Sequence, residues 1–176
     1  MVRSIVIPHD PARSPRLREL ADAGAFQEAV GGWLDLIEMP ALGVTVYMSE
    51  AARRTHAPIN CRAMAIWWLF TADPLEYPVI LGDVVLTGSG DDEGADVPDF
   101  IVREIFEARE FVVQVRPYGF DAWHDTYARF DSVFDAATWC MLLSHTLRAG
   151  ALFRLCSRTR DTDTDEHAFV GGEDSW

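Results

Sequence analysis

The sequence contains no lysine: its 15 basic residues are all arginine, and 28 acids give a net charge of −13. A chain this acidic has few cations to neutralise phosphates, which argues against nonspecific binding to DNA or RNA. The same charge argues against docking on anionic lipid. The absence of lysine from 176 residues also suggests a high-GC coding bias.

Long apolar runs and a disulfide framework are absent too. No apolar run approaches the roughly 18 residues that span a bilayer, and the apolar part of the N-terminus is too short for a signal peptide. We therefore expect a cytoplasmic protein that does not contact membranes. Cys61, Cys140 and Cys156 are an odd, widely spaced set inside apolar segments, which predicts buried thiols.

Signatures of catalysis are also missing. There is no P-loop or dinucleotide-binding fingerprint, and the histidines are scattered along the chain. The run from Thr87 to Gly90 lacks the first glycine of a nucleophile elbow. The acidic run from Asp91 to Asp96 lacks the alternating spacing and closing glutamate of a calcium loop. We expect no catalytic residues, metal or cofactor, although an enzyme of unrecognised type stays open.

Residues 26–38 organise the first half of the chain. Phe26, Ala29 and Val30 lie at helical spacing, and period-two alternation begins at Trp33. Gly31 and Gly32 stand between the two patterns, where glycine closes a helix without a Cβ clash. We predict a helix–Gly-Gly–strand joint in which at least one glycine has positive φ. A ligand groove at this joint is the less favoured alternative.

The remaining periodicities define a series of further elements. Asn60 is a favoured N-cap residue directly before an apolar helix over 61–71, and we prefer this structural role to contact with a ligand. The segment 16–21 is ambiguous between strand and helix. The other predictions are strands over 3–7, 33–39, 44–50, 79–87 (with a bulge at Gly82), 111–115, 123–130 and 151–158, and helices over 25–30, 98–109 and 133–149. The strands over 33–39 and 44–50 are predicted to form a β-hairpin.

These elements predict an α+β fold. The first part is a small mixed or antiparallel sheet with packed helices over residues 1–110. A β-β-α-β unit follows over 111–160, with the sharing of one core between the two parts left open, and 161–176 form a flexible acidic tail.

Four pieces of the first half, in this order, resemble an uncharacterised family. They are the Phe26–Gly32 joint, the strand end Val46–Glu50, Pro58-Ile59-Asn60 and the glycine-containing strand Ile80–Gly88. Over residues 2–107 the chain resembles domain-of-unknown-function family 3846, which is common in actinobacteria, phages and mobile elements. The resemblance implies a source of that kind, which the coding bias supports, but no activity.

Charge is concentrated in the second half. Residues 1–88 hold 10 acids and 7 arginines, whereas residues 89–176 hold 18 acids and 8 arginines. Spaced carboxylates can imitate the phosphates of a duplex, although most acidic proteins use such charge only for solubility. The candidate partner-facing carboxylates are those of Asp91, Asp92, Asp96, Glu104, Glu107 and Glu110.

The leading functional hypothesis is a non-enzymatic accessory protein that binds a protein partner. Its specific form is a DNA mimic that inhibits a nucleic-acid enzyme or a host defence protein. The alternative is a small-molecule-binding or sequestering protein with a pocket lined by Trp33, Trp67, Trp68 or Trp123. The oligomeric state stays open.

Overall fold

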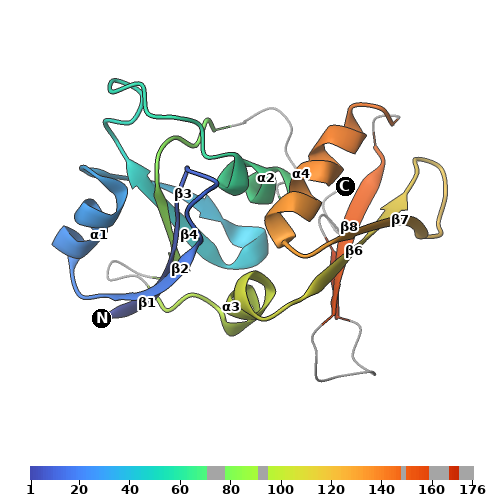
Figure 1. Ribbon diagram of the computed structural model, residues 1–176, viewed down its shortest axis with the longest axis horizontal. Coiled ribbons are helices and arrows are strands. Elements are labelled where there is room, and N and C mark those ends of the chain that lie inside the picture. The colour runs from blue at the N-terminus through green and yellow to red at the C-terminus, as the bar shows by residue number, and fades with distance from the viewer. Residues whose placement is uncertain (71–77, 91–94, 148–149, 159–166, 171–176) are drawn as a thin grey trace. The chain divides into compact units, whose positions relative to one another are not determined.

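The computed structural model describes residues 1–70, 78–90, 95–147, 150–158 and 167–170. Helices and two antiparallel sheets confirm the α+β prediction (Figure 1). The chain forms two compact units. We call them the N-terminal unit, Met1–Met64 with Tyr77–Val102, and the C-terminal unit, Ala65–Glu76 with Arg103–Trp176.

The N-terminal unit is built on a five-stranded sheet in the order β2-β1-β5-β4-β3, with every neighbouring pair antiparallel. The predicted hairpin of residues 33–50 is present as β3 and β4, which pair over six residues each. The elements are β1 Val2–Ile7, β2 Arg16–Leu20, α1 Ala23–Val30, β3 Leu34–Met39, the short 3₁₀ helix η1 Pro40–Leu42, β4 Val44–Ser49 and β5 Val84–Gly88.

Helix α1 packs on one face of this sheet (Figure 1). Phe26 and Val30 lie one turn apart on the helix and join Val6, Leu20 and Val85 of the strands in a buried cluster. The ring of Phe26 meets that of Tyr47 edge to face, with centroids 5.2 Å apart. The apolar face predicted for residues 26–30 is therefore the face that anchors the helix.

The division between the two units falls within α2 (Cys61–Phe70) and within α3 (Asp99–Phe106). Helix α3 is shorter than the predicted 98–109 because the amides of Glu107 and Ala108 both donate to the carbonyl of Arg103 and close the helix there.

The C-terminal unit contains a four-stranded antiparallel sheet in the order β7-β6-β8-β9. Helix α4 packs against β6, β7 and β8. The chain order β-β-α-β agrees with the sequence prediction. The elements are β6 Glu110–Arg116, β7 His124–Phe130, α4 Val133–Ser144, β8 Leu152–Arg158 and β9 His167–Val170.

Three elements differ from their predicted lengths or places. Strand β5 begins at Val84 instead of 79, because Gly82 has φ 73° and turns the chain before the ladder starts. Helix α4 ends near Ser144 instead of running to 149, because the hydroxyls of Ser144 and Thr146 bond carbonyls of the last turn. Strand β9 lies in the region predicted as a flexible tail, most of which is outside the described residues.

The cysteines differ in part from expectation. Cys140 and Cys156 are buried as predicted, and burial raises the pKa of the Cys140 thiol to about 12. Cys61 is exposed, because the first residue of α2 lies at the end of the helix and outside the core. All three cysteines are thiols and are not disulfide-bonded.

Candidate functional site

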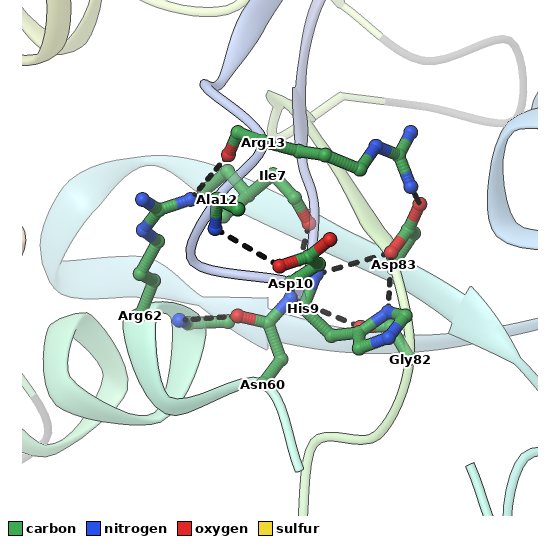
Figure 2. Close-up of polar contacts among 10 residues, drawn as sticks. Ile7, His9, Asp10, Ala12, Arg13, Asn60, Arg62, Gly82 and Asp83 are labelled. Atoms are coloured by element: carbon green, nitrogen blue, oxygen red, sulfur yellow. Dashed lines mark hydrogen bonds and ion pairs between the residues drawn. The ribbon is translucent and has the colours of Figure 1, made fainter. Parts of the chain in front are cut away.

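Asn60 joins three segments of the N-terminal unit (Figure 2). Its Oδ1 accepts from the amide of Ala63 at 3.1 Å, which is the N-cap bond of α2. Its Nδ2 donates to the carbonyls of Ile7 and Gly82, at 3.0 and 2.9 Å. The side chain is fully buried and all its polar atoms are bonded, as the free energy of burying an amide requires. Asn60 therefore holds the end of β1 and the turn before β5 against the start of α2.

His9 and Asp83 form the most tightly connected ionisable pair near this joint (Figure 2). The Nδ1 atom of His9 lies 2.6 Å from Oδ1 of Asp83, and the backbone amide of His9 donates to the same oxygen at 3.0 Å. The guanidinium of Arg13 donates to Oδ2 at 3.0 Å. Burial alone would raise the pKa of Asp83, but the hydrogen bonds from His9 and the charge of Arg13 lower it below its ordinary value.

Arg62 closes the same loop from the side of α2 (Figure 2). Its guanidinium donates to the carbonyls of Arg13 and Pro11, at 2.7 and 2.9 Å. We call His9, Arg13, Arg62 and Asp83 the loop clasp. Each of its contacts fixes the β1–β2 loop, which is what a structural role requires. Sequence reasoning missed the clasp because His9 and Asp83 are 74 residues apart and neither lies in a motif.

The two glycines of the predicted joint have different roles. Gly31 is the C-cap of α1 with φ 77°, and a Cβ there would meet nothing within 4 Å. Gly32 has no positive φ, but a Cβ on it would lie 2.5 Å from Oγ of Ser49. Backbone conformation thus requires the first glycine, and close approach to β4 favours the second.

The predicted acidic residues are not equivalent. Asp91 and Asp92 lie outside the described residues. Asp96 is exposed in the N-terminal unit, where its Oδ1 accepts from the backbone amide of Arg3 at 2.8 Å. It therefore ties the segment before α3 to β1.

The three predicted glutamates belong to the C-terminal unit. Glu104 is half-buried, and its Oε1 accepts from the hydroxyl of Ser157 at 2.7 Å. Glu110 is half-buried at the start of β6, while Glu107 is exposed just beyond α3. The expected row of fully exposed carboxylates is therefore interrupted at Glu104 and Glu110, because a helix and a strand turn these residues toward their own unit.

The four tryptophans considered for a pocket have separate environments. Trp33 is exposed beside β3, whereas Trp67 of α2 is buried. Trp68 packs on Phe153, with ring centroids 5.8 Å apart. Two guanidinium groups lie over the ring of Trp123, those of Arg154 at 4.6 Å and Arg116 at 5.3 Å from its centre.

The connection between β6 and β7 carries the largest group of exposed aromatic side chains in the C-terminal unit. The ring of Phe120 packs against that of His124, with centroids 6.4 Å apart. Trp123, which precedes His124 in the chain, has the guanidinium of Arg154 over its ring. Together with neighbouring residues of β7, this group forms what we call the hairpin surface; its residues are the exposed Tyr118, Phe120, His124 and Tyr127 and the half-buried Trp123.

Tyr127 has the most unusual geometry on this surface. It is 84% exposed and has φ 61°, a conformation that a bulky residue adopts at a cost. It lies in a bulge where three residues of β7 stand opposite Val113 of β6. The Asp125 carboxylate accepts the Tyr127 amide at 2.5 Å and is itself held by both nitrogens of the Arg129 fork, at 3.0 and 2.9 Å.

Thr126 fixes the other side of the bulge. Its hydroxyl donates to the carbonyl of Val113 at 2.8 Å and accepts from the amide of Ala128 at 3.3 Å. Side-chain hydrogen bonds of Asp125 and Thr126 therefore stabilise the bulge, which projects the ring of Tyr127 into solvent. Sequence alternation missed it, because the period-two pattern of 123–130 predicts a regular strand.

The geometry defines a two-unit α+β protein with antiparallel sheets. Residues 2–109 match the family described as Domain of unknown function (DUF3846), and the chain belongs to this family. No curated protein and no solved structure matches the chain.

Among the described residues, no three His, Cys, Asp or Glu side chains are grouped so that they could hold a metal ion. Within the same residues, no helix has the length and apolar character needed to cross a membrane.

Proposed function

We propose that this protein is a cytoplasmic, non-enzymatic accessory protein, of phage, mobile-element or actinobacterial type, that binds a protein partner through the hairpin surface. The observation that carries the proposal is Tyr127. A left-handed backbone costs an L-residue about 1–2 kcal/mol, and two side chains hold it in place while the ring stays in water. The fold gains nothing from an exposed ring, so a surface function is the better explanation.

The chemistry of the hairpin surface supports a protein partner. Tyrosine, tryptophan and arginine are the residues that most often dominate the binding energy of protein interfaces. Trp123 and the two arginines over its ring supply the tryptophan and arginine of this chemistry, and the exposed rings of Tyr118 and Tyr127 supply the tyrosine. A narrower form of the proposal, DNA mimicry against a nucleic-acid enzyme, would instead use the acidic side chains around Glu107.

The test is capture of partners from a lysate of the natural host by tagged protein and by Tyr127→Gly. Glycine accepts φ 61° without strain, so the variant should be as stable as wild type or about 1 kcal/mol more stable. We expect its partner binding to weaken at least tenfold. Leu142→Ala, which removes an exposed side chain of α4 in the same unit, is the matched control and should bind normally.

A Glu107→Arg variant separates the two forms of the proposal. Glu107 is exposed, whereas reversing the charge of Glu104 would also break its bond to Ser157. Loss of binding by Glu107→Arg with normal binding by Tyr127→Gly would favour the DNA mimic. If Tyr127→Gly binds as wild type, or is clearly less stable, the hairpin surface is not the contact surface.

A further inference from the structure

Strand β3 is an edge of the N-terminal sheet, and β4 is the only strand paired with it among the described residues. The carbonyl of Trp33 accepts from the amide of Glu50 at 2.8 Å. Hydrogen-bonded pairs alternate along an antiparallel ladder, so Asp35 and Ile37 also exchange bonds with β4. The backbone N–H and C=O groups of Leu34, Leu36 and Glu38 therefore point away from the sheet.

This edge carries two acidic side chains but otherwise lacks the usual protection of exposed strands. Natural edge strands are commonly interrupted by proline, bulges or basic side chains. The opposite edge, β2, carries exposed Arg16, Arg18 and Glu19, but β3 has no proline or arginine and pairs without a register shift. It also exposes two large apolar side chains, Trp33 at 73% and Leu36 at 51%.

One contact partly covers the open edge. The exposed carboxylate of Asp35 accepts the outward amide of Leu36 at 2.9 Å. A carbonyl of an added strand could take over this amide, because the displaced carboxylate is already in contact with water. Asp35 thus protects the edge against unspecific pairing without closing it.

The charge around the edge specifies the kind of strand that fits. Between Glu19 and Ala52 the chain has six acids and no arginine or histidine. This segment contains α1, β3 and β4, so the free edge lies in an anionic part of the unit. A second copy of this acidic segment would be repelled by its net negative charge, whereas a basic strand would be attracted.

We propose that the free edge of β3 binds an extended, basic peptide segment of a partner protein as an added strand. Backbone hydrogen bonds to Leu34, Leu36 and Glu38 supply the pairing. Arginine or lysine side chains of the peptide lie beside Asp35 on one face of the sheet, and its apolar residues lie beside Leu36 on the other face. This site is in the N-terminal unit and is independent of the hairpin surface.

The test uses a labelled eight-residue peptide of alternating arginine and valine, with fluorescence anisotropy at about 150 mM salt as readout. Two control peptides carry glutamate in place of arginine, or N-methyl groups on alternate backbone nitrogens. We expect the full-length protein to bind the first peptide at least tenfold more tightly than either control. Hydrogen exchange at the amides of Leu34 and Glu38 should slow when the first peptide is added.

Leu36→Pro tests the edge itself. Proline at 36 removes an outward amide and leaves the bonds to β4 in place. It should bind the peptide at least tenfold more weakly, while Leu36→Ala, which keeps the amide, should lose much less. Equal binding of the N-methylated peptide by wild-type protein would overturn the proposal, and this comparison does not depend on the variant folding. A dimer that dissociates in Leu36→Pro would also overturn it, since a second copy would then be the occupant.

Discussion

Single residues in this protein connect segments that are distant in the chain. The carboxylate of Asp83 binds His9 and Arg13 of the β1–β2 loop. The side-chain amide of Asn60 donates to carbonyls at the end of β1 and in the turn before β5. Sequence analysis identified Asn60 from its local cap position, because capping involves residues only three apart. It could not identify the Asp83 contacts, which depend on the strand order of the sheet.

The loop clasp predicts a pH-dependent stability. Asp83→Asn removes the charge that His9 and Arg13 bind, and we expect a loss of about 1–3 kcal/mol in the free energy of unfolding at pH 7. Because the folded-state pKa of Asp83 is lowered, its contribution is fully present above its ordinary pKa of about 4 and is lost as pH falls through the lowered value.

Urea unfolding of wild type and Asp83→Asn between pH 3 and pH 7 measures this dependence. The difference between the two proteins should shrink toward the acidic end. Ala12, whose amide contacts Asp10 in the same loop, offers a matched control as Ala12→Gly, with no such convergence expected. A constant difference over the whole range would show that the charge of Asp83 does not stabilise the fold.

At the scale of elements, helices were predicted best, and strands other than the hairpin of residues 33–50 were predicted without their partners. Helix α1 has both its apolar spacing and its caps, Asp22 and Gly31, within ten residues. The segment 16–21 stayed ambiguous because β2 is exposed at four of its five positions and so lacks a buried face. Strand β9 was missed because its place depends on pairing with β8 and not on local alternation.

The candidate surfaces also differ in whether the sequence alone can reveal them. The acidic stretch was visible in the sequence because charge is a property of composition. The bulge at Tyr127 and the open edge of β3 were not, because one depends on register and the other on strand order. Sequence alternation cannot distinguish an edge strand from a central one when both have one exposed face.

In the joint between α1 and β3, we expect substitutions at the two glycines to destabilise the protein for different reasons. Gly31→Val should destabilise the protein by more than about 1 kcal/mol, because a β-branched side chain is strained at φ 77° although there is space for it. Gly31→Asn should cost less, since asparagine tolerates this conformation. Denaturant unfolding measures both variants.

At Gly32 we expect a substitution to destabilise the protein through a close contact of the new Cβ and not through backbone strain. The loss caused by Gly32→Ala should therefore be reduced by Ser49→Gly, which removes the hydroxyl that a Cβ would meet. The same second substitution should not rescue Gly31→Val. If Ser49→Gly rescues neither or both, the separation of the two roles is wrong.

At the scale of the whole molecule, several of the arginines are engaged with the chain's own groups. Arg3 is paired with Asp99, Arg13 with Asp83 and Arg129 with Asp125. Arg62 donates to loop carbonyls, and Arg154 lies over Trp123 while bonding Gln114. These contacts engage several of the few cations within the fold. The surplus of acids therefore sets the electrostatic potential around the protein.

This distribution predicts that the protein does not bind duplex nucleic acid. With a net charge of −13, approach to a phosphate backbone is repulsive, and no counterions are released to offset it. In an electrophoretic mobility or anisotropy assay with a 20–30 base-pair duplex at about 150 mM salt, we expect no binding below roughly 100 µM protein, weaker than ordinary nonspecific binding. Lowering the salt to about 50 mM should not produce binding, because repulsion between like charges grows as screening falls.

Submicromolar binding that weakens steeply with salt would mean that a local basic surface, such as that of Arg116 and Arg154 around Trp123, overrides the global charge. The variant Arg154→Gln would then lose that binding, and the hairpin surface would be a nucleic-acid site instead of a protein-binding one.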